Sequence, residues 1–225
     1  MKTLNVILIG AGSRGRIYTD HMTDDRFRIV AVAEPVKELR DYIKNKHNLS
    51  DNMCFDDWKA LLAVPRFADI AIIATSDSMH YAPAMKAIEL GYNLLLEKPV
   101  APTYRECRDI ADAAKKKGVK VLVCHVLRYT AFFRKIKDLI NGGELGKVVS
   151  IPHSDCVGNV HQSTATSAVT GETLRKARIC FLQSPVMILI LCSGLLAVRQ
   201  RLYPHLVRLA ILNLKMHPKE HLIIV

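Results

Sequence analysis

Short apolar runs alternate with amphipathic stretches along the first half of the chain. Each run is apolar almost throughout and is bounded by glycine or polar residues, which is typical of parallel strands that are buried on both faces. The pattern predicts five strands in this part of the chain. They lie at residues 5–9, 28–33, 68–74, 92–96 and 119–123.

The stretches between these runs have their apolar residues at helical spacing. They predict helices at about 14–23, 36–46, 78–90 and 103–117, followed by a helix at 130–141 and a strand at 147–153. The helix at 103–117 ends in three lysines before Gly118, a combination that marks a helix C-terminus. Strands alternating with helices of this length indicate βαβ units. We therefore predict an α/β fold with a doubly wound parallel sheet of the Rossmann type.

The formal charge of +11 is concentrated toward one end of the chain. Residues up to Gln162 include 24 basic and 19 acidic side chains, whereas those from Ser163 onward include 8 and 2. A basic groove through the fold would not be distributed in this way, so we expect no nucleic-acid partner. The six cysteines are widely spaced without a C-x-x-C pair, which indicates reduced thiols in a cytoplasmic protein and no metal site.

A glycine-rich hexapeptide of the form G-x-G-x-x-G follows the first predicted strand and opens the first helix. In such a loop the first glycine allows the tight turn, the second lets the backbone approach a pyrophosphate, and the third lets the helix pack closely on the strand. A turn without a ligand is the alternative for the hexapeptide taken alone. In this context we expect a dinucleotide to bind at Gly10, Gly12, Ser13, Arg14 and Gly15.

An acidic residue, Glu34, ends the second predicted strand 19 positions after Gly15. A carboxylate at this place can accept both adenosine ribose hydroxyls, and it repels a 2′-phosphate. The sequence therefore predicts NAD rather than NADP, a preference that Lys37 nearby would weaken. The alternative is a solvated strand end.

Two further strands lead into polar side chains that suit a ligand site. Thr75 and His80 follow the strand at 68–74, and Glu97-Lys98-Pro99 follows the strand at 92–96. Ligands bind at the carboxyl ends of the central strands in this architecture. A lysine there can hold a substrate hydroxyl and stabilise alkoxide character. The alternatives are a solvent-facing His80 at a helix start and an ordinary surface ion pair of Glu97 with Lys98.

These motifs together resemble those of the Gfo/Idh/MocA family of NAD(P)-dependent oxidoreductases, over about residues 4–158. The resemblance rests on Gly10–Gly15, Glu34, the run from Thr75 to Gly91, Glu97-Lys98-Pro99 and the stretch from His125 to Val148. It implies hydride transfer between NAD(P) and a hydroxyl carbon of a sugar, inositol or related polyol. Lys98 would be the catalytic, substrate-facing lysine, and Thr75, His80, Glu97 and Lys98 would line the cofactor site.

The same resemblance implies a division of the chain into parts. Residues 1–125 would form the NAD(P)-binding Rossmann domain, residues 126–162 the start of a C-terminal α+β domain, and residues 163–225 an aberrant tail. In this family the second domain supplies the proton-transfer group and the sheet through which homo-oligomers form. We therefore expect most of the substrate pocket to be missing and the chain to be inactive as truncated.

The tail from Ser163 onward does not resemble that second domain. An uncharged stretch at 179–198 has the length of a membrane span, but it contains Gln183, Ser184 and Pro185, so we do not expect a membrane helix. A frame slip near residue 162 is our hypothesis for the tail. If the third base of each codon is read with the first two of the next, Met187-Ile188 becomes aspartate in every coding, and family-like strings are permitted around it.

Two other interpretations stay open at the level of sequence. One is a non-catalytic NAD-binding protein whose tail docks a membrane or a partner, and it predicts membrane partitioning of the full chain. The other is a short dehydrogenase with an unusual cap, and it predicts turnover by this chain.

Overall fold

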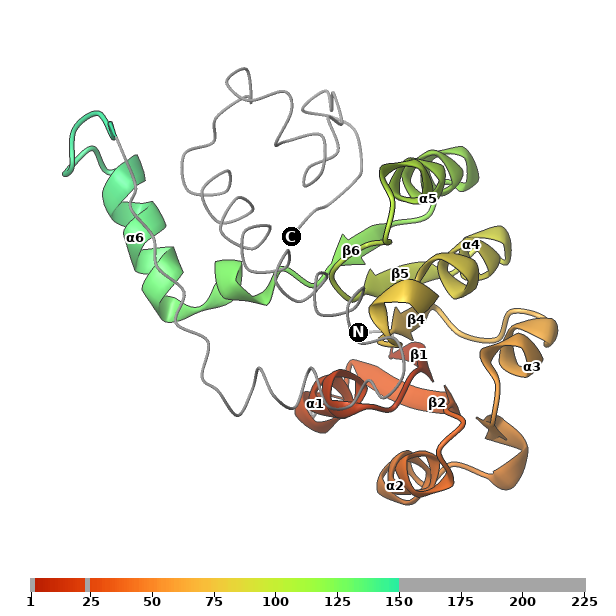
Figure 1. Ribbon diagram of the computed structural model, residues 1–225. Helices are drawn as coiled ribbons and strands as arrows, with labels where there is room; N and C mark the ends of the chain where they lie inside the picture. Colours follow the sequence, from red (N-terminus) through yellow and green to blue (C-terminus); the bar gives the residue numbers. More distant parts are fainter. Residues whose placement is uncertain (1–2, 23–24, 150–225) are drawn as a thin grey trace, which may run out of the picture. The chain divides into compact units, whose positions relative to one another are not determined.

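The structure is a computed structural model that describes residues 3–22 and 25–149 (Figure 1). The described residues belong to two compact units, of which one includes the residues up to Cys124 and the other begins at His125. The predicted tail at 163–225, its stretch of membrane-span length and the hypothetical frame slip lie outside the described residues. The predicted division at residues 125 and 162 stays a prediction.

The first unit is built on a parallel sheet with the strand order β3-β2-β1-β4-β5-β6 (Figure 1). All neighbouring strands pair in parallel, which confirms the predicted doubly wound α/β fold. The direction of winding reverses between β1 and β4. The strands are β1 (Leu4–Ile9), β2 (Phe27–Ala33), β3 (Cys54–Phe55), β4 (Ile70–Ile73), β5 (Asn93–Leu96) and β6 (Val121–Val123).

Helices cover both faces of this sheet. They are α1 (Ser13–His21), α2 (Lys37–His47), α3 (Trp58–Ala63), α4 (Tyr81–Glu89) and α5 (Tyr104–Lys117). Ile7 and Ile9 of β1 belong to a core cluster that includes residues of α3, α4 and α5. Val6 and Leu8 alternate with them and belong to the cluster on the side of α1 and α2. The strands are therefore buried on both faces, as their apolar runs predict.

Both ends of α5 are fixed by capping groups. The Thr103 hydroxyl accepts a hydrogen bond from the Glu106 backbone N–H, and the Glu106 carboxylate accepts one from the Thr103 N–H. At the other end Gly118 adopts a left-handed conformation with φ of +74°, which few other residues tolerate. The three preceding lysines lie in the last turn, where they oppose the negative end of the helix dipole.

The structure differs from the sequence prediction in several of its elements. The strand β3 and the helix α3 lie between residues 54 and 63, where we predicted no element. The helix α4 begins at Tyr81 because a 3₁₀ turn, η2 (Asp77–Met79), occupies the start of the predicted helix. Residues 147–149 are not in a strand, so the strand predicted at 147–153 is wrong over these residues, and its remainder lies outside the described part of the chain.

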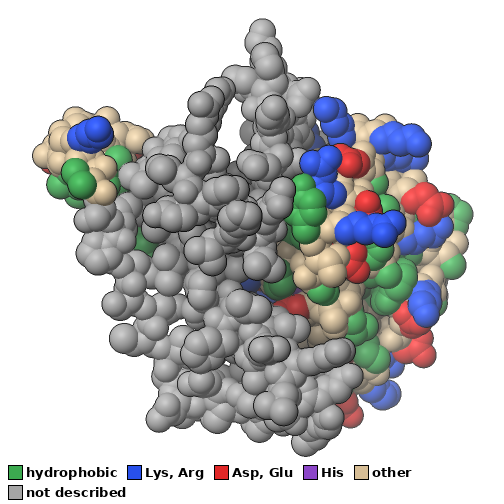
Figure 2. All heavy atoms as spheres, turned by 45° about the horizontal axis from the view of Figure 1, so that its top comes forward, with side chains coloured by type: hydrophobic (Ala, Val, Ile, Leu, Met, Phe, Trp, Pro, Cys, Tyr) green, Lys and Arg blue, Asp and Glu red, His purple; other side chains and the backbone are tan. Residues whose placement is uncertain are grey.

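The second unit contributes a 3₁₀ turn, η3 (Val126–Tyr129), and a helix, α6 (Ala131–Asn141), to the described residues. The helix predicted at 130–141 is therefore confirmed. Within residues 3–22 and 25–149 there is no helix with both the length and the apolar character that a membrane crossing needs. On the described surface in view, Lys and Arg side chains are interspersed with Asp and Glu side chains (Figure 2).

Candidate functional site

The predicted site residues of the first unit follow the carboxyl ends of neighbouring strands. Backbone hydrogen bonds continue the sheet beyond the strands, from Gly10 N to Ala33 O, Ala74 N to Ile9 O, Glu97 N to Ile73 O and Cys124 N to Leu96 O, each 2.9 Å long. The segments after β2, β1, β4, β5 and β6 therefore start side by side along one edge of the sheet, the one formed by the carboxyl ends of the strands. This edge includes the reversal point between β1 and β4, where this architecture binds its ligands.

The three glycines of the hexapeptide have different surroundings. A Cβ on Gly10, whose φ is +91°, would lie 2.7 Å from the Ala74 carbonyl carbon, and one on Gly15 would lie 2.1 Å from the Gly10 oxygen. A Cβ on Gly12 would have no atom within 4 Å. Gly10 and Gly15 thus allow β1, β4 and α1 to approach one another closely. Gly12, the N-cap of α1, leaves open space before the helix, and this fits a pyrophosphate group.

Glu34 is held against the glycine loop by two backbone groups. Its carboxylate accepts a 2.7 Å hydrogen bond from Ala11 N and a 3.0 Å hydrogen bond from Val36 N, and the residue is only 7% exposed. The interpretation of Glu34 as a solvated strand end is therefore wrong. Because each carboxylate oxygen can accept more than one hydrogen bond, both keep capacity for ribose hydroxyls. The arrangement fits the adenosine side of a dinucleotide.

The segment after β4 brings Thr75 and His80 together. The Thr75 hydroxyl oxygen is buried and has no hydrogen-bond partner among the residues that the structure describes, which suits a hydroxyl that contacts a ligand. The His80 side chain is 0% exposed, so the solvent-facing alternative is wrong. Its Nδ1 lies 2.6 Å from the Pro99 carbonyl oxygen, and its Nε2 lies 3.1 Å from the Thr75 carbonyl oxygen.

The Glu97-Lys98-Pro99 turn follows β5, and its glutamate is 5% exposed. The Glu97 carboxylate accepts a hydrogen bond from the Tyr18 hydroxyl and a 2.9 Å hydrogen bond from the backbone N–H of Lys98. The interpretation of Glu97 and Lys98 as a surface ion pair is therefore wrong, because the carboxylate is buried against α1. Lys98 itself is partly exposed, and its peptide bond to Pro99 is cis.

Sequence reasoning did not identify Tyr18 and Cys124 as parts of this site. The Cys124 thiol interacts with the Tyr18 hydroxyl, so residues of α1 and of the segments that follow β5 and β6 meet at one place. Burial, and then the contacts with Cys124 and Glu97, raise the pKa of Tyr18 well above its usual value. Tyr18 lies 79 positions from Glu97, so no local pattern could have indicated the contact.

At the start of the second unit lies His125, a titratable side chain in an unusual environment. Burial, and to a lesser extent the charge of Arg128, lowers the pKa of His125 to about 4. The imidazole is therefore neutral at physiological pH. Its Nδ1 is buried without a hydrogen-bond partner among the described residues.

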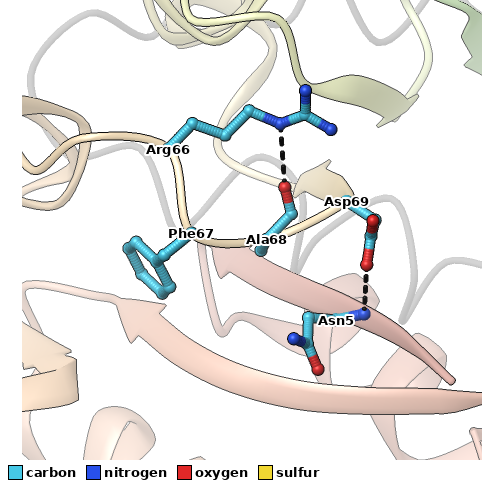
Figure 3. A pocket seen from close by; sticks show the side chains of 5 residues that line it. All are labelled: Asn5, Arg66, Phe67, Ala68 and Asp69. Carbon is cyan, nitrogen blue, oxygen red and sulfur yellow. Dashed lines mark hydrogen bonds between the residues drawn. The ribbon is translucent and has the colours of Figure 1, made fainter.

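A hollow of about 380 Å³ lies at the opposite edge of the sheet, beside the amino ends of β1 and β4 (Figure 3). Its polar groups bond mainly within the hollow: Arg66 Nε donates to Ala68 O at 3.0 Å, and the Asp69 carboxylate accepts from Asn5 N at 2.9 Å. It is separate from the edge that carries the predicted site residues. Within the described residues no group of three His, Cys, Asp or Glu side chains is arranged to hold a metal ion.

Comparison with known proteins agrees with this geometry. The model of an oxidoreductase family with an NAD-binding Rossmann fold matches residues 4–125. A 2,7-anhydro-N-acetylneuraminate hydratase from Mediterraneibacter gnavus is 30% identical over 155 residues, which cover 66% of this chain and 38% of that protein. A D-xylose 1-dehydrogenase (NADP(+)) from Hypocrea jecorina is 32% identical over 127 residues, or 56% of this chain and 32% of that protein.

A similar arrangement is found among solved structures. The myo-inositol 2-dehydrogenase of Lactobacillus plantarum has a TM-score of 0.61 at 20% identity, covering 66% of this chain and 44% of that one. At this identity the similarity shows the fold alone. The chain matches less than half the length of each of these three proteins.

Proposed function

This chain belongs to the Gfo/Idh/MocA oxidoreductase family with its NAD-binding Rossmann fold, and we propose that it transfers hydride between NAD and a hydroxyl-bearing carbon of a sugar, inositol or related polyol. The observation that carries the proposal is the position of Lys98, at the end of β5 and two strands from the glycine loop of β1. The two relatives are named for sugars, one of them as a hydratase. We therefore propose the substrate only as a class, a sugar, inositol or related polyol, and name no single compound.

The cofactor side of the proposal rests on the glycine loop and Glu34. The first backbone amides of α1, at Ser13 and Arg14, would bind the pyrophosphate, since a helix N-terminus favours anions and Gly12 leaves the approach open. Glu34 would accept the adenosine ribose hydroxyls and repel a 2′-phosphate. One relative is named for NADP(+), so the proposal assigns the preference for NAD to Glu34 of this chain.

The substrate side of the proposal rests on Lys98. NAD, when bound, supplies the hydride acceptor. Lys98 would donate a hydrogen bond to the substrate hydroxyl oxygen and stabilise the negative charge that develops there. The hydroxyl proton would pass to a base, which the family resemblance assigns to the second domain, as the hydride passes to NAD. Glu97, buried beside it and bonded to Tyr18, holds the backbone N–H of Lys98 and so fixes the turn from which the ammonium extends. The Thr75 hydroxyl would donate to the nicotinamide end of the cofactor.

Measurements on the full chain test these roles in two steps. NADH binding is measured first, by the change in its fluorescence, and NADH formation from NAD is then screened with sugars and inositols. In Lys98→Met we expect NADH affinity within about threefold of that of the unmodified chain, and turnover lower by about 10² or more, because a transition-state contact is lost. Lys120→Met is the matched control, because Lys120 is exposed and precedes β6 at the other edge of the sheet.

Either step can contradict the proposal. If the unmodified chain binds no NADH, the assignment of the cofactor site is wrong. If NADH binds but the whole screen gives no turnover, the hydride-transfer part is wrong for this chain, and the expectation that the chain is inactive as truncated is the better account. If Lys98→Met turns over as fast as Lys120→Met, the role of Lys98 is wrong.

A further inference from the structure

The side chain of His80 connects the two loops that carry Thr75 and Lys98. It is fully buried at the start of α4, and its two ring nitrogens lie 2.6 Å from the Pro99 carbonyl oxygen and 3.1 Å from the Thr75 carbonyl oxygen. Both acceptors are backbone groups, one in the segment after β4 and the other in the turn after β5. A single side chain therefore joins two neighbouring segments of the site.

The contact to Pro99 acts on the backbone immediately after Lys98. The segment before Lys98 is already fixed, since Glu97 N donates to Ile73 O at 2.9 Å and the Glu97 carboxylate accepts from Lys98 N at 2.9 Å. Pro99 has no N–H of its own, so its carbonyl is the one conventional backbone hydrogen-bonding group that it offers. With that carbonyl held by His80, the backbone is fixed on both sides of Lys98.

We propose that His80 is a positioning residue, which sets the location of Lys98 through its contact with the Pro99 carbonyl, while its other ring nitrogen lies against the Thr75 carbonyl. This inference rests on the proposed function, because Lys98 and Thr75 have their roles there. It differs from the sequence prediction that His80 binds the cofactor, since both ring nitrogens face protein carbonyl oxygens. The Thr75 hydroxyl, in contrast, has no partner among the described residues and stays available to a ligand.

Substitutions of His80 can distinguish the roles of its two ring nitrogens. A neutral imidazole has one N–H, and the contact to Pro99 is the shorter of the two. An asparagine can place its amide nitrogen near the position of Nδ1, whereas a glutamine reaches toward the position of Nε2. If the contact to Pro99 fixes Lys98, His80→Asn keeps the function of the side chain, and His80→Gln and His80→Ala lose it.

Amide hydrogen exchange of the full chain, measured without any cofactor, tests the bridge that His80 forms to the Pro99 carbonyl. In His80→Ala and His80→Gln we expect the peptide covering residues 97–103 to exchange about tenfold faster, since a buried hydrogen bond is lost, while the peptide covering β1 is unchanged. In His80→Asn exchange stays within about threefold of that of the unmodified chain. His21→Asn is the matched control, because His21 also contacts a backbone carbonyl, Ile17 O at 2.8 Å, but is exposed on α1.

Kinetics then show whether the bridge positions Lys98 for the reaction. We expect kcat to fall about tenfold in His80→Gln with KM for NAD within about threefold, and to be restored in His80→Asn. The inference is overturned if His80→Ala exchanges like the unmodified chain, or if His80→Asn is as impaired as His80→Gln. If His80→Ala does not fold, the comparison of His80→Asn with His80→Gln decides whether the contact with Pro99 is required. If the unmodified chain binds no NADH, the proposed function fails, and the exchange data still decide whether the bridge exists.

Discussion

The hydroxyl of Tyr18 connects α1 to the strand end that precedes Lys98. It donates to the buried Glu97 carboxylate, and the raised pKa of Tyr18 keeps it protonated as a donor. Tyr18→Phe removes only this hydroxyl, so the carboxylate stays buried with one donor fewer. We expect the free energy of unfolding to fall by about 1–3 kcal/mol, measured by urea denaturation.

Tyr42→Phe is the control for this change. The Tyr42 hydroxyl contacts the Asp20 carboxylate at 3.1 Å from an exposed position on α2, so its loss should cost less than about 0.5 kcal/mol. Equal costs in the two variants would mean that the contact with Glu97 is no stronger than a surface hydrogen bond.

The thiol of Cys124 should react slowly while the chain is folded. Burial, first of all, raises the pKa of Cys124 to about 11, so at pH 8 only about a thousandth of the thiol is in the reactive thiolate form. In the unfolded chain a thiol has a pKa of about 8.5, and a substantial fraction is ionised at the same pH. Alkylation of Cys124 by iodoacetamide, followed by peptide mass spectrometry, should therefore be about a hundredfold or more slower in the folded chain.

The raised pKa of Cys124 also predicts how the alkylation rate changes with pH. As the pH rises from 7 to 10, the rate in the folded chain should increase steadily without reaching a plateau, because the thiolate fraction keeps growing below a pKa of about 11. A plateau near pH 9 in the folded chain would show that Cys124 has an ordinary pKa.

The junction of β1 with α1 depends on two glycines in different ways. Alanine at Gly15 would place a Cβ 2.1 Å from the Gly10 oxygen, whereas alanine at Gly12 would meet no atom within 4 Å. We expect Gly15→Ala to lower the free energy of unfolding by about 2 kcal/mol or more, despite the better helix propensity of alanine. Gly12→Ala should change it by less than about 0.5 kcal/mol but weaken NADH binding about tenfold or more.

Chemical denaturation and fluorescence titration of the two variants measure these effects separately. If Gly12→Ala binds NADH normally, the space in front of α1 is not the pyrophosphate site. If Gly15→Ala is as stable as the unmodified chain, the close approach of α1 to the loop after β1 is not required.

At the scale of elements, sequence reasoning succeeded where a continuous apolar run, or apolar residues at helical spacing, extended over enough residues. β1, β2 and α5 are such cases, and α5 also carries its own stop signal in Gly118. It missed β3 and α3, which have two and six residues, because β3 is too short to form an apolar run and α3 is too short to show helical spacing. Their positions are fixed by tertiary contacts instead: β3 pairs with β2, and Leu61 of α3 lies in the same core cluster as Ile7 and Ile9.

Those parts of the candidate site were predictable that directly follow a strand whose end is visible in the sequence. Gly10, Glu34, Thr75 and Lys98 follow apolar runs, and the rule for parallel sheets brings such positions to one edge. The contacts between these segments were not predictable, because they join residues far apart in the chain. His80 reaches Pro99 across 19 positions, and Tyr18 reaches Glu97 across 79.

Because the site is assembled from several strand ends, cofactor binding should stabilise the Rossmann unit as a whole. A ligand that binds only the folded state at a hundredfold its dissociation constant raises the free energy of unfolding by about 2.7 kcal/mol. The buried Glu34 carboxylate should repel the 2′-phosphate of NADP. We therefore expect NADP at the same concentration to give less than about half this effect, measured by urea denaturation.

Substitution of Glu34 tests whether its charge sets this difference. Glu34→Ser removes the carboxylate, so stabilisation by NAD should decrease and the gap between NAD and NADP should close. Glu38→Ser is the control, because Glu38 is an exposed acid on the neighbouring helix α2 and should leave both effects unchanged. Lys37, which would weaken the preference, forms a 2.5 Å ion pair with Asp41, and this reduces its attraction for a phosphate. Equal stabilisation of the unmodified chain by the two cofactors would therefore mean that Glu34 does not discriminate between them.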